Sequence, residues 1–178
     1  MIKRLVIHPN DPSTDFLKPI YQSLTDATIL TGGKTKDEVR ELIEQHDQVI
    51  MLGHGSPSGL FSCGQFGMEG MIIDRSMVAA LGNKKNNIYI WCNADQFVNL
   101  YYLKGFYTGM FISEYSEAAY CNVPSFIDEV EQSNALFADV VGQSVLMEAK
   151  NIQANTKLLY YIQHSEINKY NNDRLYYR

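Results

Sequence analysis

Two side chains capable of nucleophilic and acid–base chemistry, Cys92 and His54, each follow an apolar run of strand length in this chain of 178 residues. The first run, residues 49–52, leads into a Gly-His-Gly triplet, and the second, residues 88–91, leads directly into Cys92. Because the carboxyl ends of parallel strands meet at one edge of a sheet, the two side chains are expected to lie together. A thiol, an imidazole and the backbone N–H groups of Gly55 and Cys92 are the parts that nucleophilic acyl transfer requires.

The neighbours of the two residues favour chemistry over a structural role. Glycines flank His54, which permits tight turning and close approach of the backbone to a ligand. Cys92 sits where a strand turns into an expected helix, whose N-terminus would stabilise a thiolate. A lowered pKa next to an imidazolium predicts that Cys92 is alkylated near neutral pH faster than Cys63 or Cys121. The alternative is that Cys92 is a small buried hydrophobe, the commoner role of a free cysteine.

Short strands and helices alternate around this pair. Expected strands cover residues 3–7, 27–30, 48–52, 88–91 and 106–113. Expected helices cover residues 13–24, 35–46, 74–81, 95–103, 124–141 and 143–167, and a loop or small hairpin covers 56–70. Because right-handed βαβ crossovers place helices on both faces, this order predicts an α/β fold, a three-layer αβα sandwich with a mainly parallel sheet of about five or six strands. One domain over residues 1–178 is expected, with a polar tail at 168–178.

Composition excludes several functional classes. The net charge is -5 and the pI about 5.3, and the Lys and Arg residues are scattered, so no surface suited to nucleic acid is expected. The first residues are too poor in apolar side chains for a signal peptide, and no run reaches membrane-spanning length. Three cysteines form no disulfide framework, which favours a reducing cytoplasm. No close ligand pair such as Cys-x-x-Cys occurs, so no metal or other cofactor is expected.

The motifs Leu52-Gly-His54-Gly55-Ser56 and Ile88-Tyr-Ile-Trp-Cys92 resemble those of the caspase-like (clan CD) cysteine peptidases, which include caspases, legumain, gingipains, clostripain and separase. The order of the motifs, the helical segment between them and the hairpin-like insert after His-Gly also agree with that family, over about residues 2–116. The resemblance implies a caspase-like fold and a cysteine endopeptidase that acts on peptides or proteins. It further implies that Cys92 attacks the scissile carbonyl, that His54 protonates the departing amine, and that the Gly55 and Cys92 amides form the oxyanion hole.

Specificity in the family depends on the segment after the strand that follows the nucleophile. The resemblance implies that the corresponding residues, Ser113, Glu114 and Tyr115, line the pocket for the residue preceding the cut. If Glu114 faces this pocket, it favours Lys or Arg there. An exposed, solvated Glu114 is an equally good interpretation, because carboxylates are mostly exposed.

Two other functions are compatible with the sequence. Trp91 stands where many family members have a small residue, which is also consistent with a catalytically inactive caspase-like or flavodoxin-like binding module. His164-Ser165-Glu166 matches the His-x-Glu pair of class I glutaminases, which favours a glutaminase-type amidotransferase as a further alternative.

Overall fold

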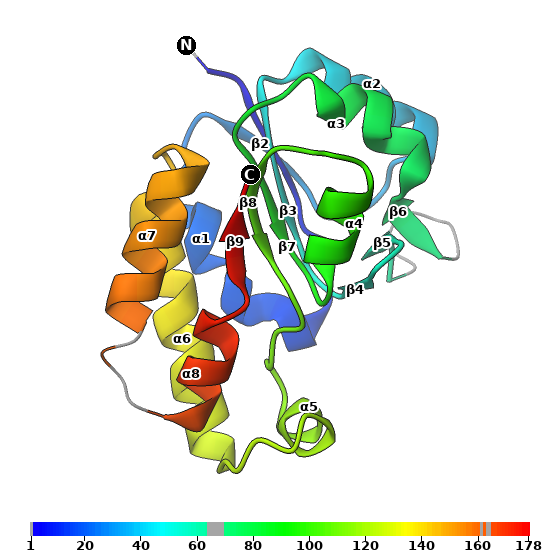
Figure 1. Cartoon of the computed structure of the whole chain (residues 1–178). Helices are drawn as coiled ribbons and strands as arrows, with labels where there is room; N and C mark the ends of the chain where they lie inside the picture. The colour runs from blue at the N-terminus through cyan, green and yellow to red at the C-terminus, as the bar shows by residue number, and fades with distance from the viewer. Residues whose placement is uncertain (1, 64–69, 161, 163–164) are drawn as a thin grey trace.

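A six-stranded sheet forms the centre of the computed structural model, which describes residues 2–63, 70–160, 162 and 165–178 (Figure 1). Its strands, in spatial order, are β2 (Ala27–Leu30), β1 (Arg4–Ile7), β3 (Gln48–Leu52), β7 (Asn87–Ile90), β8 (Gly105–Thr108) and β9 (Leu175–Tyr177). The first five run parallel, and β9 runs antiparallel to β8. The predicted α/β class with a mainly parallel sheet is confirmed.

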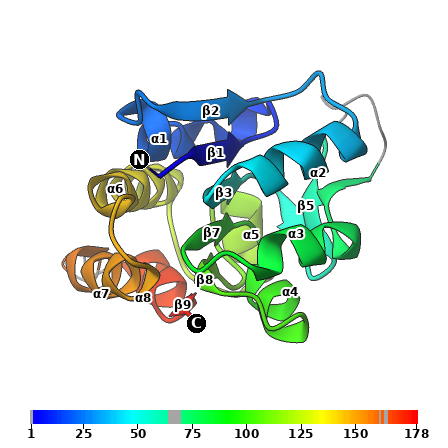
Figure 2. The same cartoon turned by 90° about the horizontal axis from the view of Figure 1, so that it is seen from above.

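Helices cover both faces of the sheet, as the view from above shows (Figure 2). One face carries α2 (Lys36–Gln45), α3 (Val78–Gly82) and α4 (Ala94–Leu100), and the other carries α1 (Pro19–Gln22), α6 (Ile127–Ser144) and α7 (Ala149–Tyr160). Successive strand side chains point to opposite faces, so the continuous apolar run of β3 supplies both cores. Val49 and Met51 pack on the α2 side, whereas Ile50 and Leu52 pack on the α6 side.

A small antiparallel sheet follows His54 and consists of β4 (Gly55–Ser56), β5 (Gly59–Phe61) and β6 (Met71–Ile73). A Cβ atom on Gly59 would overlap the backbone carbonyl of Ile73, and its φ of +143° is open only to glycine, so this strand pair requires glycine there. The hairpin expected after His-Gly is therefore present, although residues 64–69 of the expected insert lie outside the described residues.

Three predicted elements differ most from the structure in their extent. The predicted helix 13–24 is interrupted because Pro19 cannot donate a backbone hydrogen bond, so a 3₁₀ helix, η1 (Pro12–Leu17), precedes α1. The predicted strand 106–113 is the shorter β8, which ends at Thr108, although the Gly109 carbonyl still accepts from the Asn93 N–H at 3.0 Å. The predicted helix 143–167 is replaced by α7 and by α8 (Glu166–Asn172), whose N-cap is Ser165. Two shorter helices complete the described chain, η2 (Arg75–Met77) and α5 (Tyr115–Tyr120).

The last residues, for which no element was predicted, form the end of α8 and strand β9. Leu175 is fully buried, and the ring of Tyr176 packs on Tyr107 with 5.7 Å between centroids. Burial of these side chains against β8 explains why the segment is ordered as an edge strand. In the described part of the chain, no helix has the length and apolar character needed to cross a bilayer.

A buried histidine, His8, lies just beyond β1 and packs edge-on against Tyr21. Its Nδ1 is 3.0 Å from Tyr21 Oη, and its Nε2 is 3.0 Å from Thr14 Oγ1. Because Thr14 Oγ1 donates to the Asp11 carbonyl, it accepts from His8, which places the imidazole proton on Nε2. Burial lowers the pKa of His8 from 6.5 to about 4, so the ring is neutral in the folded protein at pH 7.

This buried ring makes the stability of the protein depend on acid pH. A lowered folded-state pKa contributes stability that is complete above pH 6.5 and is lost as the pH falls through about 4. We expect the free energy of unfolding to lose about 3 kcal/mol from His8 over this interval. Urea unfolding of the wild type and of His8→Gln, measured at several pH values, checks this. Equal pH slopes for the two proteins would contradict it.

Candidate active site

His54 and Cys92 follow strands β3 and β7 at the carboxyl edge of the parallel sheet, which is the lower end of the strands in Figure 1. The β3–β7 register pairs Leu52 with Ile90, so each candidate residue lies two positions beyond this pair. The Gly53 N–H donates to the Ile90 carbonyl at 3.1 Å, which carries the pairing past the end of β3. The structure thus brings His54 and Cys92, which are far apart in sequence, to the walls of one cavity.

The cavity between them is small. Phe16 and Leu17 of η1 form one wall, and Phe111 and Ser113 from the segment after β8 form another. Its volume is about 20 Å³, which is room for roughly one water molecule. A substrate side chain does not fit unless one of these walls moves.

The imidazole of His54 is oriented by a short chain of hydrogen bonds. Its Nε2 is 2.7 Å from Ser13 Oγ, which donates to Asp11 Oδ1 at 2.8 Å. Because the Asp11 carboxylate only accepts, the single Ser13 hydroxyl proton goes to it, and His54 Nε2–H donates to Ser13. In the neutral imidazole, Nδ1 then carries the lone pair and is the atom that can act as a general base.

Asp11 is held in place by its own local role. It is the N-cap of η1 and accepts the Ser13 N–H at 3.0 Å. The hydrogen bonds from Ser13 hold the pKa of the Asp11 carboxyl below its usual range. Asp11 therefore stays ionised near neutral pH and keeps the direction of the hydrogen bonds that orient His54.

The thiol of Cys92 is held in the protonated form, contrary to the prediction of a lowered pKa. Its Sγ donates to the Phe111 carbonyl at 3.3 Å and lies 3.7 Å from Glu117 Oε1. Burial, followed by the nearby Glu117 carboxylate, raises the pKa of Cys92 to about 12. Both effects disfavour the thiolate, because they remove water and add a like charge.

The helix expected to stabilise the thiolate offers little compensation. Helix α4 begins at Ala94 and has seven residues, and Asn93 separates it from Cys92 with a left-handed φ of 65°. The thiol therefore precedes the first turn of a short helix, where the electrostatic effect is weak. Burial and the Glu117 carboxylate therefore have a larger effect on the pKa of Cys92 than the helix N-terminus.

Trp91, the residue before the candidate nucleophile, packs into the core. Its ring lies 5.7 Å from that of Tyr89 and 5.8 Å from that of Phe97, and its Nε1 donates to the Ser56 carbonyl at 3.1 Å. A Cβ atom on Gly55 would overlap the indole ring. Contact with Trp91 is thus a sufficient structural reason for this glycine, which the sequence interpretation had assigned to ligand approach.

The Gly55 amide remains a candidate oxyanion donor. Gly55 pairs with Leu60, and the Phe61 N–H donates to the His54 carbonyl at 2.9 Å. This pattern makes Gly55 and Leu60 a non-hydrogen-bonded pair, in which the N–H points away from the partner strand. The Gly55 N–H is therefore not used by the β4–β5 ladder.

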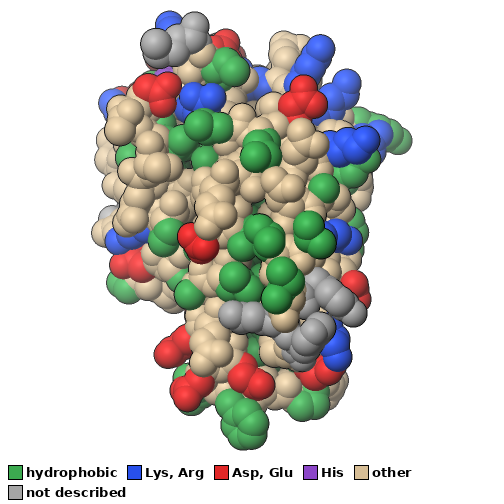
Figure 3. All heavy atoms as spheres, turned by 90° about the vertical axis from the view of Figure 1, so that its left-hand side faces the viewer, with side chains coloured by type: hydrophobic (Ala, Val, Ile, Leu, Met, Phe, Trp, Pro, Cys, Tyr) green, Lys and Arg blue, Asp and Glu red, His purple; other side chains and the backbone are tan. Residues whose placement is uncertain are grey.

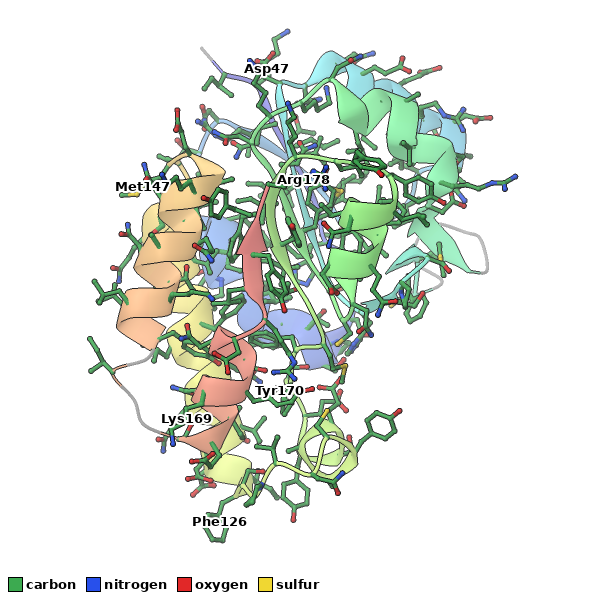
Figure 4. All side chains as sticks on the ribbon, viewed as in Figure 1. Asp47, Phe126, Met147, Lys169, Tyr170 and Arg178 are labelled. Atoms are coloured by element: carbon green, nitrogen blue, oxygen red, sulfur yellow. The ribbon has the colours of Figure 1, made fainter. Side chains whose placement is uncertain are left out.

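The three residues expected to line a specificity pocket do not all face the cavity. Ser113 lines it, and the Glu114 carboxylate lies beside His54, with 4.0 Å between Oε1 and Nε2. Tyr115 is more than half exposed and lines a separate pocket with Val123 and Phe126, and Phe126 lies at the far lower end of the molecule in Figure 4. Glu114 is about half exposed, so a charged side chain can reach it from solvent.

Three polar residues at the site were not identified from the sequence. Asp11 and Ser13 follow β1, and β1 pairs with β3, so a correct strand order would have placed them beside His54. Glu117 accepts hydrogen bonds from the Ser113 and Glu114 N–H groups at 2.7 and 3.0 Å and forms a capping box with Glu114. The spacing of Glu114 and Glu117 was the available signal for this helix start.

No protein-family model, curated protein or solved structure matches this chain. The likeness to caspase-like peptidases therefore rests on the two motifs. Among the described residues, no group of three or more His, Cys, Asp or Glu side chains is arranged to hold a metal ion. His164, on which the glutaminase alternative depends, lies outside the described residues, and Glu166 pairs with Lys169 on α8 at 2.7 Å.

Proposed function

We propose that this protein is a caspase-like cysteine endopeptidase in which Cys92 is the nucleophile and His54 moves the proton. The observation that carries the proposal is that both residues line one cavity at the carboxyl ends of adjacent parallel strands. The orientation of His54 by Ser13 and Asp11 supports it, because it leaves Nδ1 able to accept a proton.

In the proposed reaction, His54 Nδ1 takes the proton of the Cys92 thiol as Sγ attacks the carbonyl carbon of the scissile peptide bond. The Gly55 and Cys92 N–H groups donate to the oxyanion. His54 then gives its proton to the amine nitrogen as the C–N bond breaks, which leaves a thioester. Water hydrolyses the thioester with His54 as base, which releases the carboxylic acid and restores the thiol.

If this site is that of a peptidase, the Cys92 thiol is protonated before substrate binds. In this proposal, substrate binding displaces one wall of the cavity of about 20 Å³, either η1 or the segment after β8, and the raised pKa of Cys92 describes the site before that movement. The same two observations favour the second candidate, a binding module with an inert thiol. A measurement of peptide cleavage distinguishes the peptidase from the binding module.

The proposal is tested with a library of fluorogenic peptides that places basic, acidic and Asn residues before the cut. We expect wild type and Cys121→Ala to cleave a subset of the library, and Cys92→Ala to lose roughly a thousandfold or more in rate. Cys121 is a matched control because its thiol contacts Tyr170 and lies outside the cavity. Equal signal from wild type and Cys92→Ala would reject the peptidase and leave the binding module.

A further inference from the structure

A larger pocket lies beside the candidate active site, between η1 and α6, and is called here the η1–α6 pocket. Its volume is about 550 Å³, which is within the range of ligand-binding pockets. Two residues connect it to the site. Phe16 lines both this pocket and the cavity of Cys92, and Ser13 lines this pocket while its Oγ contacts His54. A polypeptide held at Cys92 therefore passes close to the η1–α6 pocket.

The wall contributed by α6 contains a polar side chain with an unmet hydrogen-bonding need. Asn134 is only 8% exposed, and its Nδ2 donates to the Ser113 carbonyl at 2.8 Å. This bond fixes the amide orientation and leaves Oδ1 as the acceptor. Within the described chain, Asn134 Oδ1 is buried and has no hydrogen-bond partner. Because Oδ1 is closed to solvent, a ligand in the open pocket does not reach it, and the role of Asn134 is to tie the α6 wall to Ser113.

The charges around the pocket favour a cationic ligand. Asp15 pairs with Lys18 at 2.8 Å, so these two charges offset each other. Glu131 lines the pocket, and no ion pair joins it to any residue that the structure describes. One net negative charge remains. Acidic side chains also gather at the lower end of the face seen in Figure 3.

We propose that the η1–α6 pocket binds an Arg or Lys side chain of the polypeptide substrate, at a position other than the one that faces Glu114. A carboxylate and an aromatic ring are groups that recognise a guanidinium or ammonium, and Glu131 and Phe16 supply them. This inference rests on the proposed function, because it takes the ligand of the pocket to be the substrate of the peptidase. It makes the substrate a basic polypeptide segment, with one cation at Glu114 and a second at Glu131.

The test measures binding without cleavage. Fluorescein-labelled peptides in which a single Arg is moved through an uncharged six-residue sequence are titrated against Cys92→Ala protein by anisotropy, with norleucine as the uncharged replacement. We expect Arg at the position that reaches Glu131 to tighten binding about tenfold over norleucine, separately from the position that reaches Glu114. Glu131→Gln is expected to remove most of this preference, and Phe16→Leu part of it.

The matched control is Asp139→Asn, which removes an equal charge from an exposed site on the same helix away from the pocket. It should keep the Arg preference. Equal binding of Arg and norleucine peptides, or an equal loss in Asp139→Asn and Glu131→Gln, would overturn the proposal. Because cleavage is measured separately on wild type, an inactive protein that keeps the Arg preference rejects the peptidase but supports the pocket.

Discussion

Cys92 in the folded protein will react with iodoacetamide at pH 7 far more slowly than in the unfolded chain. The thiolate is the reactive species, and a rise in pKa from 9 to about 12 lowers its fraction about a thousandfold. A more basic thiolate is intrinsically more nucleophilic, which recovers roughly 20-fold. The net expectation is a rate about 50-fold lower. Burial slows the reagent further.

The measurement is mass spectrometry of the labelled Cys92 peptide over time, in native buffer and in urea. Glu117→Gln should raise the native rate, because the amide still accepts from the Ser113 N–H but no longer repels a thiolate. Glu114→Gln is the control, since that carboxylate lies beside His54. Native labelling faster than labelling in urea would show that Cys92 is a thiolate after all and would reject the buried, Glu117-repelled thiol described above.

Replacement of Trp91 by Ala will destabilise the protein by about 3–5 kcal/mol. The indole is 2% exposed and packs between Tyr89 and Phe97, so its removal leaves a large cavity. It also removes one donor to the Ser56 carbonyl. Because Ser56 and Gly55 form β4, the loss is expected to loosen the backbone next to His54 as well.

Urea unfolding measures this change. Trp91→Phe keeps most of the packing and loses the N–H, so we expect it to cost about 1–3 kcal/mol. Tyr120→Ala removes an aromatic ring that is 83% exposed and should leave stability nearly unchanged. A loss below about 1 kcal/mol for Trp91→Ala would contradict the packing of the indole in the core.

The sequence by itself determined the architecture around the site. The apolar run of β3 is buried on both faces, as a continuous run requires, and Thr35 and Glu38 form the predicted capping box at the start of α2. Parallel strands end at one edge, so the positions of His54 and Cys92 after their strands were enough to predict that they lie together. These features depend on local pattern and on general rules of sheet topology.

Only the tertiary structure determined the protonation of the Cys92 thiol and the orientation of the His54 ring. The pKa of Cys92 depends on burial and on Glu117, and the orientation of His54 depends on Ser13 and Asp11. These partners come from segments distant in sequence, and no local pattern around His54 or Cys92 encodes them. An electrostatic environment is the sum of all neighbours in space, whereas a strand or a capping box is specified by a few consecutive residues. The positions of His54 and Cys92 could therefore be predicted from the sequence, but not their polar partners or the charge state of the thiol.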